Sequence, residues 1–298
     1  MRSFLPALLS LALWIGGMAC SPPSAESPAQ SEGFIELRDH EGRLVQLQEP
    51  PRRIVSLVPS ASEALLRLGA SDRLVGRTQY DTQPELAHLP SVGGGLHPSL
   101  EALLELRPDL VIRFGGESDR ATPRGLDHAG IPHMAVRTDG VDDIFEILTF
   151  LGTVVDEPGE ARSVIDNIRR ELAAVSEAVS TRPRVRVAYL LGGSPPWVAG
   201  PGTFIHELMD AAGGENAFSD LADLYGPISP ELLLVRDIDL LLATGGSQLE
   251  LPPGAPPVAR VPDITQSPGP ALGDAVWALA QILHPGLLRQ ELETRRQP

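Results

Sequence analysis

Apolar and polar residues alternate on both sides of a short polar run near the start of the chain. The stretch GFIELRDHEGRLVQLQEP alternates about residues 39–42, which predicts a β-hairpin. From residue 54 onward, short apolar runs of strand length are separated by segments with leucines at helical spacing. Strands that alternate with helices predict βαβ units and a parallel sheet covered on both faces.

Residues 142–180 carry a purely helical pattern. Residues 156–159 interrupt it, and an amphipathic stretch of about 23 residues follows, long enough for a helix of roughly 34 Å. RPRVRVAYLLGG then restarts the alternation of strands and helices. The fold class is therefore α/β, with two Rossmann-like lobes of mainly parallel sheets joined by a long backbone helix. The predicted parts are a first lobe at 34–140, bridging helices at 141–182 and a second lobe at 183–298.

The two predicted lobes contain similar segments. SLEALLELRPDLVI aligns without a gap with SPELLLVRDIDLLL, and both predict a serine N-cap, an acidic first helical turn, an amphipathic helix and a buried strand. The matching positions are Ser99 and Ser229, Glu101 and Glu231, and Asp109 and Asp239. A duplicated lobe is the simplest explanation.

The first 20 residues predict a lipoprotein signal peptide. MRSFLPALLSLALWIGGMAC has one arginine, an apolar run too short to span a bilayer, and small residues that end at Cys20. Cys20 is the single cysteine, so no internal disulfide can form. Residues 21–33 predict a disordered polar tether. Gly17 departs from the lipoprotein pattern, and cleavage near Ala19 would instead give a soluble periplasmic protein.

Charge and motif content narrow the function. The formal net charge is −15, which argues against a nucleic-acid partner, and no lysine is present for Schiff-base or phosphate-loop chemistry. The chain has no G-x-S-x-G elbow and no metal-spaced histidine and cysteine cluster. We therefore expect no catalytic residues, no metal site and no resident cofactor.

Several stretches in order resemble one protein class. LPSVGGGLHPSLEALLELRPDLVI, AGGENAF, ISPELLL and ALAQILHPG are similar to segments of the substrate-binding proteins of bacterial ABC importers for cobalamin, haem and iron-siderophores. This class has two lobes joined by a helical backbone. The resemblance implies a periplasmic monomer, held at a membrane only by its lipid anchor, that delivers a small-molecule chelate to a permease dimer.

The resemblance also implies that one glutamate on each lobe contacts permease arginines. The matching positions are Glu101 and Glu231. A carboxylate in a capped first helical turn is held outward and suits arginine pairing. Each glutamate also fits a simpler role, because acidic residues in the first turn offset the helix dipole in any protein.

Aromatic residues and one loop mark the predicted cleft between the lobes. Loops at strand carboxyl ends form the ligand crevice of open parallel sheets, and flat rings suit a corrin or porphyrin. The candidates are Tyr80, Gly95, His97, Phe114, Trp197 and Tyr225. The rings equally fit loop packing, and His97 is either an axial ligand to haem iron or cobalt or a solvated loop residue.

Arginines are candidates for ligand anions, and two departures leave the ligand class open. Arg77, Arg113 and Arg120 either meet ligand carboxylates or phosphates or lie on the surface. Many relatives have an aromatic residue where this chain has residues 93–95, and arginines near PGP where it has Ser267 and Ala271. A corrinoid receptor is the preferred function. A haem or siderophore receptor, an exported two-lobed enzyme and an orphan sensor lipoprotein are the alternatives.

Overall fold

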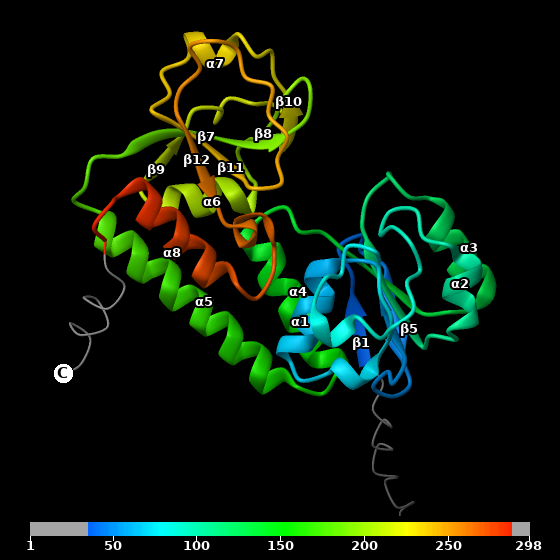
Figure 1. Cartoon of the computed structure of the whole chain (residues 1–298). Helices are drawn as coiled ribbons and strands as arrows, with labels where there is room; N and C mark the ends of the chain where they lie inside the picture. The colour runs from blue at the N-terminus through cyan, green and yellow to red at the C-terminus, as the bar shows by residue number, and fades with distance from the viewer. Residues whose placement is uncertain (1–34, 288–298) are drawn as a thin grey trace, which may run out of the picture. The chain divides into compact units, whose positions relative to one another are not determined.

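The computed structural model describes residues 35–287 (Figure 1). The predicted signal peptide, the Cys20 lipidation site and the tether lie outside the described residues. Within residues 35–287, every helix is too short or too polar to cross a membrane.

The first lobe contains a hairpin and a parallel sheet. The hairpin consists of β1 (Ile35–Arg38) and β2 (Leu44–Leu47), which pair antiparallel as the alternating pattern predicted. Four parallel strands follow in the spatial order β4-β3-β5-β6. Their bounds are β3 (Ile54–Ser56), β4 (Leu74–Gly76), β5 (Leu110–Phe114) and β6 (His133–Val136).

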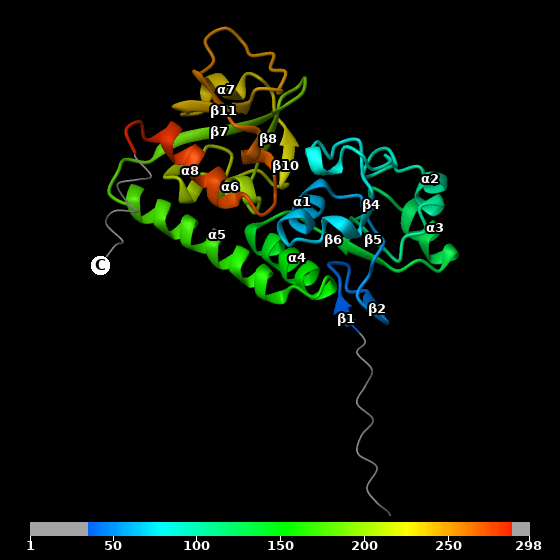
Figure 2. The ribbon, with the colours of Figure 1, turned by 60° about the horizontal axis from the view of Figure 1, so that its bottom comes forward.

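Helices cover both faces of this sheet, as its apolar strands require. The helices are α1 (Pro59–Arg67), α2 (Leu100–Glu105), α3 (Ala121–Ala129) and α4 (Val141–Val154), with short 3₁₀ turns at Ser71–Arg73 and Pro84–Leu86. Figures 1 and 2 show α2 and α3 on one side of the strands and α1 and α4 on the other. Alternate side chains of β5 accordingly enter two separate cores: Ile112 packs with the α4 side, and Val111 with Leu103 and Leu126.

The hairpin turn covers the open edge of the sheet. β6 is one of the two edge strands of this sheet, and an uncovered edge is a site of aggregation. The backbone N–H of His40 donates to the carbonyl of Ala135 at 3.1 Å, and that of Ala135 donates to the Asp39 carboxylate at 2.9 Å. The Arg137 N–H donates to the His40 ring at 2.8 Å. The turn therefore satisfies backbone groups that the edge would otherwise expose.

The predicted helical segment forms two helices. α4 ends where Asp156 adopts a left-handed backbone, and α5 (Pro158–Val179) begins with proline in its first turn, where the missing N–H is tolerated. α5 has 22 residues and packs along α8 (Leu272–Leu283) of the second lobe, as Figure 1 shows. Trp277 of α8 is buried, as expected, and its indole N–H donates to Glu171 of α5 at 2.5 Å.

The second sheet is mixed. β8 runs antiparallel to β7 and β10, whereas β9, β11 and β12 extend the parallel part. The strands are β7 (Val185–Gly192), β8 (Trp197–Ala199), β9 (Gly214–Asn216), β10 (Tyr225–Pro227), β11 (Leu240–Thr244) and β12 (Val258–Val261). The remaining helices are α6 (Phe204–Ala211), α7 (Leu232–Val235) and the 3₁₀ turn Asp263–Gln266.

The aspartates of the sequence repeat form equivalent contacts in the two lobes. Asp109 precedes β5 and accepts from the backbone N–H groups of Arg52 and Arg53 at 2.8 and 2.9 Å. Asp239 precedes β11 and accepts from the N–H of Arg186 at 2.8 Å. Each aspartate joins the amino ends of two neighbouring parallel strands. The aligned segments are therefore structurally equivalent.

The sequence pair Pro59-Ser60 favours a turn between the first strand and the first helix, but the structure shows that α1 begins at Pro59 itself. Proline is favoured in the first helical turn because its fixed φ suits the helix and its absent N–H has no intrahelical partner there. The helix therefore starts immediately behind β3 and presents its first turn at the end of that strand.

A half-buried carboxyl lies where the two lobes touch. Glu63 of α1 accepts from the Ser267 hydroxyl of the second lobe at 3.1 Å. A Cβ on Gly269 would lie 3.3 Å from the Glu63 carboxylate and 3.6 Å from Ser60, so the second-lobe loop abuts α1 closely. Burial raises the pKa of the Glu63 carboxyl, and the Ser267 hydrogen bond opposes this shift.

The Glu63→Gln substitution should stabilise the protein at neutral pH. A raised folded-state pKa means that the charged form costs free energy in the folded chain, so this group's stabilisation is greatest below its ordinary pKa of 4.5 and is lost as pH rises through the raised value. Glutamine removes the charge and keeps an acceptor for Ser267. Thermal unfolding should show a higher Tm for the variant at pH 7 and a shrinking difference toward pH 4.5. A difference that stays constant with pH would contradict the burial effect.

Candidate functional site

The first lobe has its strand-order switch between β3 and β5. The chain passes from β3 outward to β4, then returns to place β5 on the other side of β3. In open parallel sheets, ligands bind outside the carboxyl ends of the strands at such a switch point. We call the edge with these carboxyl ends the strand-end edge. Gly95 lies there, because a Cβ at this position would be 2.2 Å from the Leu57 carbonyl oxygen after β3 and 3.1 Å from Phe114 of β5.

The structure brings three predicted residues of the first lobe together at this switch point. The Tyr80 ring lies next to Gly94, since a Cβ there would be 3.9 Å from the ring, and the side chain is 61% exposed. Phe114 is half-buried beneath Gly95, and His97 is exposed on the same loop. The loop at 93–95 has no aromatic residue, as noted from the sequence, but Tyr80 supplies a ring beside it.

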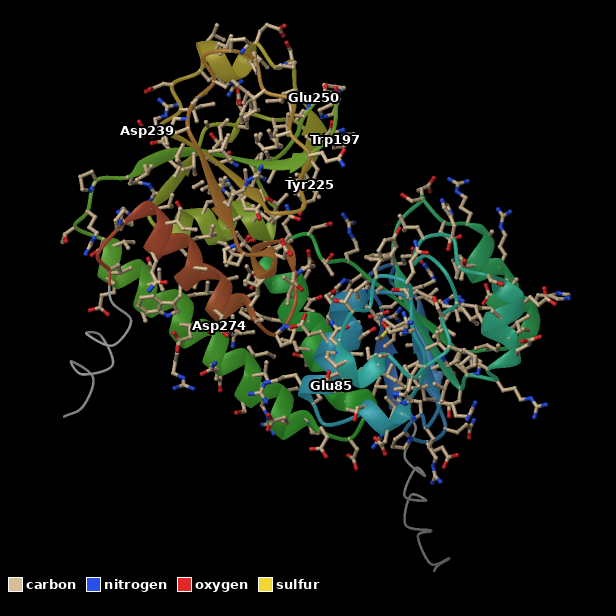
Figure 3. The ribbon with its side chains drawn as sticks, viewed as in Figure 1. Glu85, Trp197, Tyr225, Asp239, Glu250 and Asp274 are labelled. Carbon is tan, nitrogen blue, oxygen red and sulfur yellow. The ribbon has the colours of Figure 1, made fainter. Side chains whose placement is uncertain are left out.

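The second lobe has an equivalent switch point between β7 and β11. The segments that follow these strands pair through Gly193 and Leu249, and the Ser194 hydroxyl donates to Glu250 at 2.9 Å. Trp197 packs beside Gly193, whose Cβ would lie 3.2 Å from the indole, and remains 45% exposed. Figure 3 shows Trp197 and Glu250 on the same side of the lobe.

Glu250 was missed in the sequence analysis. The rule that selected Tyr80 and Phe114, that ligand residues follow strand ends, applies equally to the loop after β11. That loop, GGSQLE, contains no aromatic residue, and only aromatic residues were sought there. The structure places its carboxylate beside the Trp197 loop.

Tyr225 lies deeper than the sequence suggested. In the β8–β10 pair, Trp197 is opposite Pro227 and Ala199 is opposite Tyr225, so the tryptophan and the tyrosine are diagonal neighbours on one face. Tyr225 is half-buried against the main core. Burial, and then the negative charge of Asp139, raise the pKa of its hydroxyl. The phenol therefore stays neutral and can donate a hydrogen bond.

Glu101 and Glu231 are both exposed but are held differently. The Ser99 hydroxyl caps α2 by accepting from the Ala102 N–H at 3.2 Å, as predicted, and Glu101 lies in the first turn. Ser229 was expected to cap α7 in the same way, and this is wrong. α7 begins only at Leu232, so the Ser229 hydroxyl instead donates to the Glu231 carboxylate. This bond is the main cause of the lowered pKa of Glu231.

Arg113 is unavailable as a ligand for anions. Its side chain is 4% exposed, and it donates to the Glu41 carboxylate at 2.5 and 3.2 Å and to the His133 ring at 3.1 Å. His133 is buried too, and burial, then Arg43 and Arg113, lower the pKa of its ring. These residues fasten the hairpin to β5 and β6. The sequence could not show this, because Glu41 and Arg113 are far apart along the chain.

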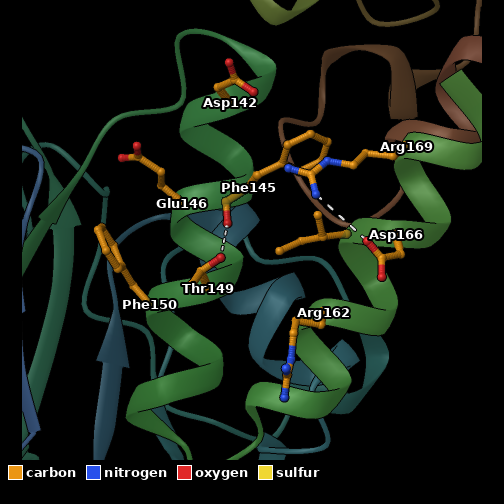
Figure 4. A pocket seen from close by; sticks show the side chains of 9 residues that line it. Asp142, Phe145, Glu146, Thr149, Phe150, Arg162, Asp166 and Arg169 are labelled. Atoms are coloured by element: carbon orange, nitrogen blue, oxygen red, sulfur yellow. Dashed lines mark hydrogen bonds and ion pairs between the residues drawn. The ribbon is translucent and has the colours of Figure 1, made fainter. Parts of the chain in front are cut away.

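A groove of about 540 Å³ lies between α4 and α5, away from both switch points (Figure 4). The Arg169 guanidinium stands over the Phe145 ring at 4.8 Å and lies 3.9 Å from Asp166. Arg169 of the groove therefore already has an aromatic and an acidic neighbour. The groove is lined by residues of the two bridging helices.

The described residues offer aromatic surface and hydrogen-bonding groups at the switch points. Within residues 35–287, no group of three or more His, Asp or Glu side chains is placed to hold a metal ion. The exposed rings of Tyr80 and Trp197 provide flat apolar area at the strand-end edges of the two lobes. Such surfaces bind planar or macrocyclic ligands through buried area and stacking.

The Gly95→Ala substitution should destabilise the protein by about 1–3 kcal/mol, because the new methyl group meets a backbone carbonyl that cannot move aside. Urea unfolding measures the change. Gly159→Ala is the matched control, since a Cβ at that helical position meets nothing within 4 Å and should cause no loss of stability. Equal effects of the two substitutions would show that the close approach at Gly95 is unimportant.

Known proteins resemble the chain along most of its length. A 30% identical cobalamin-binding protein of Halobacterium salinarum aligns over 239 residues, which are 76% of this chain and 63% of that protein's length. An uncharacterized ABC transporter substrate-binding lipoprotein of Bacillus subtilis is 22% identical, covering 95% of this chain and 97% of that one. The periplasmic haem-binding protein of Roseiflexus sp. RS-1, solved in its apo form, matches with a TM-score of 0.66 and 25% identity over 78% of this chain and 99% of that one.

These comparisons confirm the predicted α/β fold with two lobes. A model of the family described as periplasmic binding protein also matches residues 54–259, which include the four-stranded sheet, α4 and α5, and the second sheet up to part of β12. The matched segment covers more than half of the chain and contains both switch points. The chain therefore belongs to the periplasmic binding protein family.

Proposed function

We propose that this protein is an extracytoplasmic substrate-binding protein that captures a cobalamin-like corrinoid in a cleft between its lobes and delivers it to an ABC importer. The chelate is cargo, and the protein works as a monomer without a resident cofactor. Binding, release and docking are then its whole activity.

One observation carries this proposal: each lobe presents an exposed aromatic ring at its own switch point. Tyr80 stands beside the loop that crosses β3 and β5, and Trp197 stands beside the segments that follow β7 and β11. An enzyme built on one sheet needs only one strand-end edge for its site. A two-lobed receptor uses the strand-end edges of both lobes. Two rings from two lobes suit a broad macrocycle held between them.

The relatives support the receptor class and leave its cargo to experiment. The Halobacterium relative is named for cobalamin, and the Roseiflexus structure for haem. A haem or ferric-siderophore receptor is therefore the second candidate. The exported-enzyme alternative has no such support, because these relatives are named as binding proteins.

We further propose that Glu101 and Glu231 dock on arginines of a permease dimer. Both carboxylates are exposed, each at the start of a short helix that precedes an equivalent strand. The Ser229 hydroxyl keeps Glu231 charged by lowering its pKa. An exposed carboxylate on each lobe suits recognition by arginine, which guides register more than it adds affinity.

Lipidation of Cys20 remains part of the proposal. The Bacillus relative is named as a lipoprotein, which supports a membrane anchor ahead of the tether. Cleavage near Ala19 would instead give a soluble periplasmic receptor.

Cyanocobalamin should quench the fluorescence of the mature protein, mainly through Trp197. Mature chain from residue 20 onward has two tryptophans, the exposed Trp197 and the buried Trp277. Titration should give a saturable loss of emission, and Tyr80→Ala should weaken binding because it removes one ring surface.

Trp197→Phe is the control for this titration. The variant keeps an aromatic surface and retains Trp277 as a reporter of folding, so the corrinoid should still bind by calorimetry while most of the fluorescence response disappears. If the protein does not bind cyanocobalamin but binds haemin or a ferric siderophore tightly, the corrinoid proposal is wrong and the protein is a haem or siderophore receptor.

Combined Glu101→Ala and Glu231→Ala substitutions should lower uptake in cells by about tenfold or more, because both permease contacts are lost. Ligand affinity of the purified double variant should stay unchanged. The control is the pair Glu49→Ala and Glu177→Ala, which removes two exposed glutamates elsewhere. Normal uptake by the first double variant would refute the docking role.

A further inference from the structure

Strand polarity places several arginines of this protein at the amino ends of the sheet strands. Arg52, Arg53 and Arg107 precede parallel strands of the first sheet, and Arg184 and Arg186 lie at the start of β7. All five are therefore at the amino-end edges of the sheets. Ligands of this fold class bind at the opposite, strand-end edges.

The arginines near the strand-end edge of the first lobe already have protein partners. Arg77 donates to the Thr78 carbonyl at 3.0 Å, while its buried Nε has no hydrogen-bond partner. Arg113 is buried against Glu41, and Arg120 pairs with Glu117. Arg137 pairs with Asp139 at 2.5 Å. Each of the last three charges is balanced by an adjacent carboxylate.

The second lobe repeats this arrangement. Arg260 of β12 reaches the carboxyl end of β11 and donates to the Thr244 carbonyl at 2.7 Å and to the Ser247 carbonyl at 3.4 Å. Backbone carbonyls therefore take its hydrogen bonds.

In the described part of the chain, three carboxylates at the same edges form no ion pair. Glu250 accepts from the Ser194 hydroxyl next to Trp197. Asp81 is 4% exposed and accepts from the backbone N–H and hydroxyl of Thr78, below Tyr80. Asp119 accepts from two backbone N–H groups at the start of α3. Within residues 35–287, three of these arginines thus form ion pairs, Arg77 and Arg260 donate to backbone carbonyls, and Glu250 is an exposed carboxylate without an ion-pair partner.

We infer that the binding site selects against anionic chelates, and that its cargo is a neutral or cationic macrocycle whose rim carries amides. This inference rests on the proposed function and narrows its ligand class. A carboxylate-bearing ligand would face the exposed Glu250 carboxylate beside Trp197, and like charges brought together weaken binding. The formal net charge of −15 adds a long-range repulsion of the same sign.

Amide groups fit the same surroundings. Their N–H groups donate to carboxylates such as Glu250, and their carbonyls accept from a neutral phenol such as Tyr225. A corrin ring with its amide side chains, or a neutral ferric hydroxamate, meets this description. A haem with two propionates, or a ferric tricatecholate, does not.

The test compares probes that differ in charge, with dissociation constants measured by calorimetry at low salt. The matched pair is cyanocobalamin and its monocarboxylic acid derivative, in which one rim amide is hydrolysed. Haemin and neutral ferrichrome complete the panel. We expect the monocarboxylate to bind about tenfold more weakly than cyanocobalamin at low ionic strength. In 0.5 M salt, at a Debye length of about 4–5 Å, this ratio should fall toward one.

Two variants distinguish the effect of the charge near the binding edge from the effect of the net charge of the protein on this affinity ratio. Glu250→Gln removes one negative charge at the strand-end edge and keeps an acceptor for Ser194, so it should narrow the affinity ratio of the matched pair. Glu177→Gln removes one exposed charge on α5 and should leave the ratio unchanged. An equal effect of both variants would overturn the local origin of the selection.

The remaining outcomes distinguish this inference from the proposed function. Equal affinities of the matched pair, or haemin binding as tightly as the best neutral probe, would overturn charge selection and leave a chelate receptor. Failure to bind every probe would overturn the proposed receptor function together with the inference. Preferential binding of ferrichrome over cyanocobalamin would support charge selection and reject the corrinoid.

Discussion

The common direction of the parallel strands is the constraint on which the rest of this structure depends. Parallel pairing brings all carboxyl ends of a sheet to one edge, so residues that are distant in sequence gather there. Asp109 and Asp239 secure the opposite edge in each lobe by joining the amino ends of adjacent strands. The loops at the strand-end edge carry glycines and the exposed rings of Tyr80 and Trp197.

Much of the fold could be predicted from local pattern. From residue 54 onward, apolar residues recur clearly at the spacings typical of strands and helices. The repeat was also readable, since Asp109 and Asp239 occupy matching positions and make matching contacts. Local chemistry was less predictable. Pro59 starts a helix where a turn was expected, and Ser229 binds Glu231 because the helix behind it begins later than in the first lobe.

The candidate site was predictable in its loops but not in its charges. Tyr80, Phe114 and Trp197 follow strand ends, and strand ends can be read from sequence. Whether an arginine is free depends on long-range pairing: Arg113 is neutralised by Glu41, 72 residues away along the chain, and no periodic pattern links the two. Glu250 escaped notice because its loop lacks an aromatic residue. Its importance comes only from its place beside Trp197.

The hairpin turn over β6 has a consequence for the order of folding. Asp39 accepts from the Ala135 N–H across 96 residues, so the hairpin turn is synthesised long before the β6 edge on which it docks. Contacts of such long sequence separation form late, because a large loop must close first. We therefore expect the β6 edge of the first sheet to stay uncovered until the hairpin turn docks on it, which limits pairing of that edge with other chains.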